Sequence, residues 1–334
     1  MFARNLQSIS KFTRSYSTGP QQSSKGLYIG AKLNSAGALA LFAGGYTLLN
    51  KDSSSGPLPA STSKSDRIES LQTPQVALTK ENFTNLTLKN VKKYNHDSSI
   101  FEFELPGSSV SGLETAGLVV VKAADDSVKG DNGKPVIRPY TPISTGDTRG
   151  QIDFLIKKYD DGKFTPYIHS LKPGDQLAIK GPLQKFKWVP NTYEKIGLIA
   201  GGSGITPMTQ LAETILNNPE DKTKVTLLFA NKTPEDILLK ETLDDWKKKY
   251  PEQFNVVYTI DKETPGWDGL VGYFTGDILK KNLPAPGSNG KTYVCGPPPM
   301  MKAISGNKTN KGAQGELTGI LKELGYTEDQ IFKY

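Results

Sequence analysis

The spacing of hydrophobic residues changes near residue 191. Before it, the stretches 83–91 and 99–105 alternate apolar with polar residues, and 118–121 is a continuous β-branched run. Turn signals separate these stretches, which predicts β-strands. After it, apolar stretches such as 196–200 are followed by residues at helical spacing, the pattern of βα units. We predict a small antiparallel β-barrel over 75–182, a linker at 183–194 and an α/β Rossmann-like domain with a parallel sheet over 195–334.

The N-terminal segment has a different composition. Its first 51 residues contain no Asp or Glu but several Lys, Arg and Ser, which is typical of a mitochondrial presequence. A basic tail without a targeting role is the alternative. Between Lys32 and Lys51 no residue is charged, and this length is borderline for a membrane span. We predict a presequence at 1–32, a hydrophobic anchor or sorting segment at 33–50, and a Ser/Pro/Gly linker at 51–74.

Composition excludes several classes of function. The net charge of +7 favours an acidic partner or phosphate-bearing ligands, but no basic run is interleaved with aromatic residues, so we predict no nucleic-acid partner. One cysteine excludes an intrachain disulfide, and two histidines with one cysteine argue against a metal site. We assign neither His96 nor His169 a catalytic role.

The stretch Arg-Pro-Tyr-Thr-Pro-Ile-Ser at 138–144 carries the first chemical signal. Each proline favours extended backbone in the residue before it, so Arg138 and Tyr140 should point to one face. The planar donor fork of Arg138 beside the Tyr140 ring suits a ligand that is flat at one end and phosphorylated at the other. The alternative is a Pro-rich turn with an exposed arginine.

The next expected strand, 152–159, repeats this pairing of cation and aromatic ring. Alternation places Leu155, Lys157 and Tyr159 on the face away from the core. In the following loop we expect Thr165 to be the N-cap of a short helix and Pro166 its first residue, which makes a phosphate site at the helix start. An ordinary capped surface helix is the alternative.

The second domain offers three further candidates. Gly201-Gly202-Ser203-Gly204 lies between a predicted strand and a predicted helix capped by Thr206, where glycines allow a dinucleotide pyrophosphate to approach. Asp236, after the next strand, fits the ribose hydroxyls of NADH and would repel a 2′-phosphate, or it is a first-turn helix acid. Cys295 ends a strand at the ligand edge of the sheet, or it is a small buried hydrophobic residue.

With these motifs in order, the chain resembles the NADH-cytochrome b5 reductases of the ferredoxin reductase type, closest to the fungal mitochondrial form, over about residues 75–334. The motifs that carry the resemblance are Arg-Pro-Tyr-Thr-Pro-Ile-Ser at 138–144, Gly-Gly-Ser-Gly-Ile-Thr-Pro-Met at 201–208, Phe-Ala-Asn at 229–231 with Asp236, and Cys-Gly-Pro-Pro-Pro-Met at 295–300. One departure is Leu118, which stands where many members have a histidine proposed to relay protons. This leaves the proton route open.

The resemblance implies FAD in the first domain and NADH in the second. It implies catalytic positions at Tyr140 against the isoalloxazine, Thr141 near flavin N5, Lys157 assisting NADH binding, and Cys295. The cofactor-binding residues that it implies are Arg138, Pro139, Tyr140, Thr141, Leu155, Ile156, Lys157, Tyr159, Gly162, Lys163, Phe164, Thr165, Gly202, Ser203, Gly204, Thr206, Asp236, Cys295, Gly296, Pro297, Met300 and Phe332.

The expected reaction is hydride transfer from NADH to FAD, followed by single-electron transfer to cytochrome b5 or a similar haem protein. A basic rim formed by Lys157, Lys158, Lys163, Lys185 and Lys187 would steer the acidic cytochrome, or these are solvated lysines. We expect a monomer anchored to a mitochondrial membrane, most simply the outer one, with an intermembrane-space form after processing. Alternatives are the same flavin fold with another acceptor, and a membrane-tethered nucleotide sensor without turnover.

Overall fold

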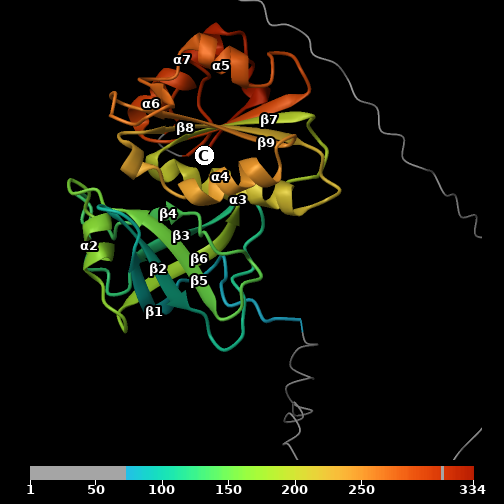
Figure 1. Ribbon diagram of the computed structural model, residues 1–334. Coiled ribbons are helices and arrows are strands. Elements are labelled where there is room, and N and C mark those ends of the chain that lie inside the picture. Colours follow the sequence, from blue (N-terminus) through green and yellow to red (C-terminus); the bar gives the residue numbers. More distant parts are fainter. Residues whose placement is uncertain (1–72, 310–311) are drawn as a thin grey trace, which may run out of the picture. The chain divides into compact units, whose positions relative to one another are not determined.

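A computed structural model describes residues 73–309 and 312–334 (Figure 1). These residues belong to one compact unit, Ser63–Tyr334. The expected presequence, the hydrophobic segment and nearly all of the expected linker at 51–74 lie outside the described residues. Within the described part, none of the helices has the length and hydrophobicity needed to cross a bilayer.

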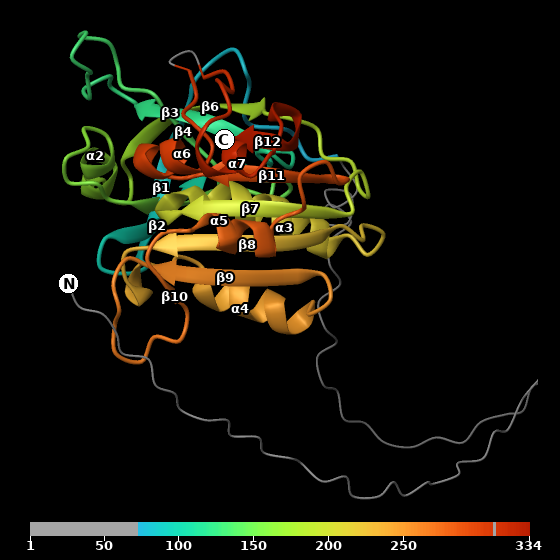
Figure 2. The same ribbon diagram turned by 90° about the horizontal axis from the view of Figure 1, so that it is seen from above.

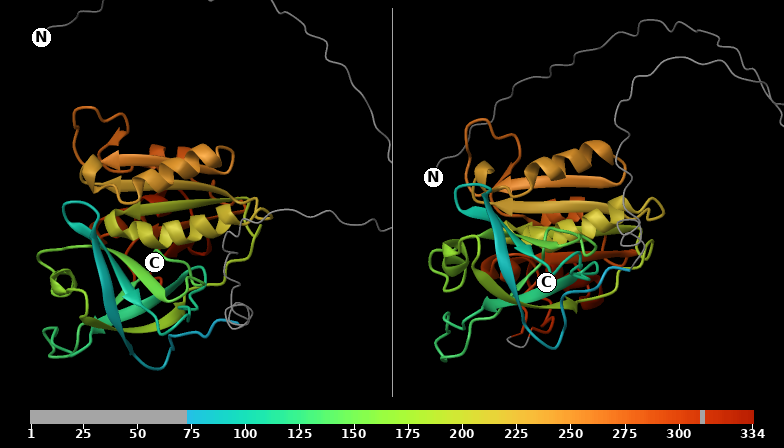
Figure 3. Two further views of the ribbon diagram at one scale, coloured as in Figure 1. Left: turned by 60° about the horizontal axis from the view of Figure 1, so that its bottom comes forward. Right: turned by 90° about the horizontal axis from the view of Figure 1, so that it is seen from below.

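The first domain is an antiparallel sheet, as predicted. Its described strands lie in the order β4-β3-β6-β1-β2-β5. Their bounds are β1 Thr84–Lys93, β2 Ser98–Glu104, β3 Gly117–Ala123, β4 Arg138–Tyr140, β5 Gln151–Lys157 and β6 Gln176–Gln184, and the short helix α2 spans Thr165–Ser170. The backbone N–H of Ile143, just after β4, donates to the carbonyl of Asp153 in β5 at 2.9 Å, so the two edges of the sheet meet (Figure 3).

Alternation along the strands builds the core of this domain. Phe101 and Phe103 on β2 are fully buried, and the ring of Phe103 packs edge-on against Phe154 of β5 with ring centroids 6.0 Å apart. Ile152 and Ile156 also face this core, as the pattern predicted. Strand β6 was not predicted, although it contributes the buried Leu177 and Ile179. Its interior glycine and proline obscure the alternating pattern.

The second domain is a parallel sheet with helices on both faces. Strand order is β10-β9-β8-β7-β11-β12 within the described residues. The elements are β7 Lys195–Gly201, η1 Gly202–Gly204, α3 Ile205–Asn217, β8 Lys224–Asn231, η2 Pro234–Asp236, α4 Lys240–Lys249, β9 Phe254–Ile260, β10 Leu270–Val271, α5 Gly276–Asn282, β11 Gly290–Cys295, α6 Pro298–Ile304, α7 Gly319–Glu323, η3 Glu328–Gln330 and β12 Ile331–Lys333.

Two apolar clusters cover the two faces of this sheet. Helices α3 and α4 pack on one face through residues such as Met208 and Leu243, and α5, α6 and α7 pack on the other through Leu279, Met301 and Leu321. Figure 1 shows these two helix layers, and Figure 2 shows β7, β8, β9 and β10 side by side. Their carboxyl ends therefore share one edge, where a parallel sheet binds ligands.

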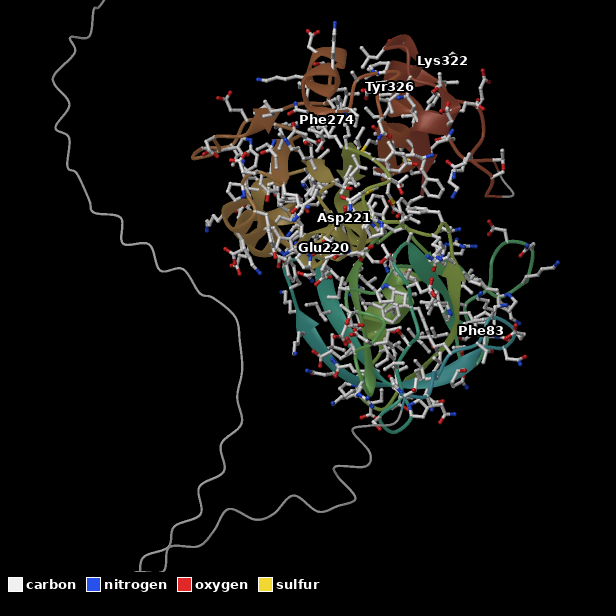
Figure 4. All side chains as sticks on the ribbon, turned by 90° about the vertical axis from the view of Figure 1, so that its right-hand side faces the viewer. Phe83, Glu220, Asp221, Phe274, Lys322 and Tyr326 are labelled. Atoms are coloured by element: carbon white, nitrogen blue, oxygen red, sulfur yellow. The ribbon has the colours of Figure 1, made fainter. Side chains whose placement is uncertain are left out.

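The segment between β6 and β7 is tied to the second domain by a buried carboxylate. Asp221, labelled in Figure 4, accepts hydrogen bonds from the Trp188 indole at 2.9 Å and from the backbone N–H of Asn191 at 3.2 Å. Asp221 is 1% exposed, so these bonds satisfy a charge that burial would otherwise destabilise. The connection is therefore held at a defined place.

Direct contacts also join the two domains. Leu155 of β5 is buried in the apolar cluster of the second domain, which explains why the face opposite the first core is apolar at this point. The hydroxyls of Thr115 and Thr214 lie 2.8 Å apart, and the Gln210 amide donates to the Gly117 carbonyl at 3.2 Å. The middle and the C-terminal half of α3 thus pack on the first domain.

Candidate active site: a cleft between the two domains

A cleft of about 540 Å³ lies between the first domain and the carboxyl edge of the parallel sheet. Most of the residues expected from the sequence line it. They are Arg138, Pro139, Tyr140, Thr141, Leu155, Ile156, Lys157, Tyr159, Gly162, Lys163, Phe164, Thr165, Ser203, Gly204, Thr206, Cys295, Gly296 and Pro297. Motifs that lie between positions 138 and 297 of the chain therefore meet at one place.

The Arg138–Tyr140 segment forms an edge strand rather than the alternative turn. In β4, Arg138 pairs with Val121 and Tyr140 with Val119 of β3, so both side chains leave the same face. The Arg138 guanidinium is exposed and donates to the Ile137 carbonyl at 2.9 Å, and no carboxylate among the described residues forms an ion pair with it. This leaves most of its donor fork available to a ligand.

Tyr140 is held by aromatic neighbours at the floor of the cleft. Its ring lies edge-on to Phe154 and tilted against Phe164, with centroids 6.2 and 6.4 Å away. Burial raises the pKa of the Tyr140 phenol well above its ordinary value. The phenol therefore stays neutral across the physiological range and offers a fixed flat surface.

Lys157 connects the two domains through charge. Its ammonium forms an ion pair with Asp97 of the first domain and donates to Asp236 Oδ1 of the second at 2.8 Å. Burial lowers the pKa of Lys157, but the hydrogen bonds to Asp236 and Asp97 outweigh it, so the net pKa is raised. Lys157 therefore stays charged, with a side chain that is only 11% exposed.

Asp236 has the helix-start role that the sequence had left as an alternative. Its Oδ2 accepts from the backbone N–H and the hydroxyl of Thr233 at 3.1 and 3.0 Å, which completes a capping box in η2. Burial raises the pKa of Asp236, and the bond to Lys157 and its charge outweigh this, so the pKa is lowered. Asp236 lies beside the cleft but is not part of its lining.

Two predicted helix caps are wrong. Thr165 is the first residue of α2, with Phe164 at the N-cap, and its hydroxyl instead binds the backbone of Tyr159, accepting from the N–H at 2.9 Å and donating to the carbonyl at 3.2 Å. Thr206 is likewise inside α3, because the turn η1 ahead of it places Gly204 at the N-cap. The Thr206 hydroxyl donates to the Ser203 carbonyl at 3.4 Å, so both hydroxyls bind nearby backbone groups instead of capping a helix start.

Glycines form the wall that the second domain contributes. Gly204 packs so closely on β11 that a Cβ there would contact the Cys295 carbonyl oxygen and lie 2.6 Å from the carbonyl carbon. Gly202 adopts φ +52°, and a Cβ there would meet only the Tyr159 hydroxyl, at 4.0 Å. Tyr159 in turn lies 2.9 Å from the Ser203 hydroxyl, so the two domains touch at the cleft.

Cys295 lies at the cleft edge of β11, paired with Ala200 of β7. Burial raises the pKa of its thiol to about 12, so the thiol stays protonated and is not an activated nucleophile. The side chain is nevertheless part of the cleft lining, with Gly296 beside it. Both predictions for Cys295 therefore hold in part: it is half-buried, and it lines the cleft.

Gly202, Asp236, Met300 and Phe332 are predicted site residues that are not in the cleft lining. The Met300 thioether packs against the backbone of Gly201 and Gly296 instead. The Phe332 ring lies in an aromatic cluster with Phe186 and Tyr293, at centroid distances of 5.0 and 5.9 Å. The reason is its position in β12, whose pairing with β11 turns Phe332 toward the interdomain segment.

Sequence reasoning missed four lining residues: Leu118, Pro207, Pro298 and Tyr334. Tyr334 reaches the cleft because its backbone N–H donates to the Val294 carbonyl at 3.0 Å, extending the pairing of β12. Its hydroxyl is buried without a hydrogen-bond partner among the described residues. The alternation of Ile331, Phe332 and Lys333 was a signal for a last strand, but three residues are too few to predict a strand from their pattern.

Known proteins agree with this arrangement. A family model described as an oxidoreductase FAD-binding domain matches residues 85–188, and one described as an oxidoreductase NAD-binding domain matches 198–306. The chain is 54% identical over 260 residues to NADH-cytochrome b5 reductase 2 of Mycosarcoma maydis, which covers 77% of this chain and 74% of the relative. The chain belongs to the NADH-cytochrome b5 reductase family.

Two further relatives support the family assignment. NADH-cytochrome b5 reductase 2 of Pyricularia oryzae is 43% identical over 344 residues, with 100% of both chains covered. Among solved structures, the cytochrome b5 reductase domain of Ulva prolifera nitrate reductase superimposes with a TM-score of 0.66 at 29% identity, covering 78% of this chain and 100% of that one. As members of this family do, the chain uses FAD and NADH as cofactors.

The described residues fit these two cofactors. The first domain offers a flat ring and a guanidinium without an acidic partner, which suit an isoalloxazine and a pyrophosphate. The second domain offers glycine backbone in the cleft lining, at Gly204 and Gly296, and the carboxyl edge of a parallel sheet, which suit a dinucleotide. The donor set therefore matches the chemistry of both ligands.

Proposed function

We propose that this chain oxidises NADH with bound FAD and passes the electrons one at a time to cytochrome b5. The observation that carries the proposal is the cleft itself, in which Arg138 and Tyr140 of one domain face Gly204 and Gly296 of the other. Bound FAD supplies the chemistry, since it accepts a hydride and releases single electrons. The chain supplies binding, orientation and exclusion of water.

Each wall has its own task in this proposal. Arg138 would hold the flavin phosphates and Tyr140 would support the flavin ring, and Thr141 lines the same cleft. The glycines would let the NADH pyrophosphate approach without steric conflict. Cys295 would give the bound ligand a neutral, weakly polar contact, because its thiol stays protonated.

NADH selection rests on Asp236 in this proposal, with an electrostatic qualification. Its carboxylate is partly neutralised by Lys157 and is already bound to Thr233. The pair Asp236 and Lys157 therefore presents a small net charge to the nucleotide ribose, and the ribose hydroxyls must compete with Thr233 for the carboxylate oxygens. The cluster holds a second carboxylate, Asp97, against the single ammonium of Lys157. Its net negative charge would repel a 2′-phosphate.

The basic rim proposed for the cytochrome consists of four lysines rather than five. Lys158, Lys163, Lys185 and Lys187 are exposed, whereas Lys157 is enclosed between its two carboxylates. Exposed lysines favour an acidic partner and act mainly on the rate of encounter. Lys163 and Lys158 carry local acidic partners, Asp131 and Asp160, so Lys185 and Lys187 are the stronger candidates.

We also propose mitochondrial targeting and membrane attachment through residues 1–50. The support is the acid-free, Lys- and Arg-bearing composition followed by an uncharged apolar stretch. The test compares the full chain with one that begins at residue 75, each fused at its C-terminus to a fluorescent protein. Mitochondrial, carbonate-resistant fluorescence that requires residues 1–74 is expected. Equal cytosolic distribution of both chains contradicts targeting.

Purified protein tests the enzymatic proposal. A yellow flavin spectrum, bleaching by NADH in a stopped-flow instrument and fast reduction of cytochrome b5 are expected. Protein that retains flavin but reduces only an iron–sulfur protein or a quinone would assign another acceptor. Flavin that NADH cannot bleach would leave the nucleotide-sensor alternative, and a preference for NADPH would contradict the role of Asp236.

A further inference from the structure

The turn between β1 and β2, residues 94–97, reaches from the first domain to the second. The backbone N–H of Leu239 donates to the Tyr94 hydroxyl at 2.7 Å, and the Asn95 amide donates to the Glu235 carbonyl at 3.0 Å. These bonds join residues 145 and 140 positions apart in the chain. The family motifs include neither Tyr94 nor Asn95.

The partners of this turn are backbone groups at the start of a helix. Leu239 precedes α4 at its N-cap and adopts a left-handed conformation, φ 56°. Backbone N–H groups at a helix start lack partners within the helix, and a left-handed non-glycine residue persists only where its surroundings hold it. Tyr94 therefore provides, from another domain, a partner that α4 cannot provide for itself.

Hydrogen bonds within the turn orient the Asn95 side chain for its contact with the second domain. Its Oδ1 accepts from the backbone N–H groups of Asp97 and Ser98 at 3.2 and 2.8 Å, which closes the turn. This leaves Nδ2 as the group that faces Glu235. The two ends of one amide thus have separate tasks, an internal one and an interdomain one.

The segment held by the turn carries Asp236. The Lys157 ammonium binds both Asp236 and Asp97, and Asp97 belongs to the turn. The imidazole of His96, also in the turn, lies 3.6 Å from the Asp236 carboxylate. Backbone contacts at Glu235 and Leu239 therefore bracket Asp236 from both sides along the chain. The position of Asp236 beside the cleft therefore depends on the first domain.

We propose that Tyr94 and Asn95 are positioning residues for the nicotinamide nucleotide. They hold residues 233–239 so that the Asp236 carboxylate stays where the ribose of a bound nucleotide would reach it. The proposal rests on the proposed function, because it assumes that NADH binds at this edge of the sheet. It assigns to the β1–β2 turn a part in nucleotide affinity and none in flavin retention.

Two variants of the full chain each weaken one of these interdomain hydrogen bonds and leave the turn closed. Asn95→Asp keeps the Oδ1 acceptor that closes the turn but removes the Nδ2 donor and places a carboxylate against the Glu235 carbonyl. Tyr94→Phe removes one oxygen atom. Asn218→Asp is a matched control in a turn where the side chain accepts only from Glu220 at 3.1 Å, and Tyr273→Phe is a matched control at a ring that is 84% exposed.

The first readout is hydrogen exchange of the holoprotein without NADH. Residues 233–243 are expected to exchange faster in Tyr94→Phe and Asn95→Asp than in the unmodified chain and the two controls. The second readout is steady-state kinetics, in which KM for NADH is expected to rise about threefold to tenfold, the effect of one lost hydrogen bond. The kcat value and the flavin content are expected to stay within about twofold.

Unchanged exchange and unchanged KM in both variants would overturn the proposal. A parallel loss of kcat, flavin and thermal midpoint would also overturn it, since that pattern indicates a merely structural turn. Failure of the proposed function looks different, because the unmodified chain would then not be bleached by NADH. The exchange readout does not depend on activity and reports on the two interdomain hydrogen bonds in either case.

Discussion

The two walls of the cleft are built on opposite principles. The wall of the first domain presents functional groups of side chains, namely the guanidinium of Arg138, the ring of Tyr140 and the ammonium of Lys157. Among the described residues, the wall of the second domain carries no charged side chain and includes glycine backbone, since Gly204 and Gly296 leave no room for a side chain against their neighbours. The first wall can therefore bind a ligand through its functional groups, and the second can let a ligand approach its main chain at the glycines.

This difference predicts different responses to substitution. Loss of a group from the side-chain wall weakens one contact and leaves the packing intact, so its effect is graded. Addition of a single carbon at Gly204 forces main chains apart, because the nearest atoms belong to the Cys295 carbonyl, whereas at Gly296 they belong to the flexible Met300 side chain. The expected effect is therefore largest at Gly204.

Gly204→Ala is expected to have the largest effect. The new Cβ would contact the Cys295 carbonyl group, which is backbone and cannot rotate away. Overpacking of this kind destabilises a protein by about 1–3 kcal/mol. The measurement is the urea midpoint together with the rate of flavin reduction by NADH.

Gly276→Ala is the control for this experiment. Its Cβ would lie 3.7 Å from the nearest neighbour, so the substitution should be neutral or stabilise the chain by about 0.4–1 kcal/mol. Equal midpoints for the two alanine variants would show that the glycine wall is not as tight as described.

Arg138→Ala is expected to weaken FAD binding by about 1.5–3 kcal/mol, roughly tenfold to a hundredfold, the value of a hydrogen bond to a charged group. Arg138→Lys should recover only part of this, because an ammonium lacks the planar fork. The flavin-to-protein absorbance ratio after gel filtration measures the effect. Arg149→Ala, at another exposed arginine, is the control, and full flavin occupancy in Arg138→Ala would refute the assignment.

Asp236→Asn is expected to lower the free energy of unfolding by about 1.5–3 kcal/mol at pH 7, the range for a hydrogen bond to a charged group. The loss stays moderate because Lys157 keeps its ion pair with Asp97. The folded-state pKa of Asp236 is lowered, so its contribution is present above the unfolded value near 4 and is lost as the pH falls through the folded value.

The difference in urea midpoint between the unmodified chain and Asp236→Asn should therefore shrink from pH 7 to pH 3. Asp245→Asn provides a control at a carboxylate that is 75% exposed and pairs only loosely, at 3.5 Å, with Lys248. A difference of the same size at both pH values would show that the ionised form of Asp236 does not contribute.

Cys295→Ala is expected to have the smallest effect on pH dependence. The raised thiol pKa of about 12 keeps the unmodified side chain neutral from pH 6 to 9, so neither chain should show an inflection in kcat from this group. Steady-state profiles of the two proteins should run parallel. An inflection in the unmodified chain that disappears in Cys295→Ala would mean that the thiol ionises during turnover.

Much of the fold follows from local patterns. The alternation along residues 99–105 and the continuous apolar run at 196–200 correspond to β2 and β7, because burial on one or on both faces leaves a direct record in the sequence. Strands such as β10 and β12, of two and three residues, leave too short a record. Strand β6 escaped notice because Gly181 and Pro182 interrupt its pattern.

The candidate site was predictable where its residues form compact motifs. Arg138 and Tyr140 share a face by alternation, and Gly204 meets Cys295 because β7 and β11 are parallel neighbours that end together. Strand, glycine turn and helix start is a local arrangement, so its ligand edge can be inferred without the fold. The sequence by itself therefore determined the two domains, the cofactor class and most of the cleft lining.

Only the tertiary structure decided which polar groups pair. Thr165 binds Tyr159 rather than capping its helix, and Phe332 joins an aromatic cluster rather than the cleft. Asp236 meets Lys157 from a position 79 residues away, and Leu239 meets Tyr94 from the other domain. Hydrogen bonds and ion pairs act over a few ångströms in space regardless of separation in the chain, so no local pattern records them.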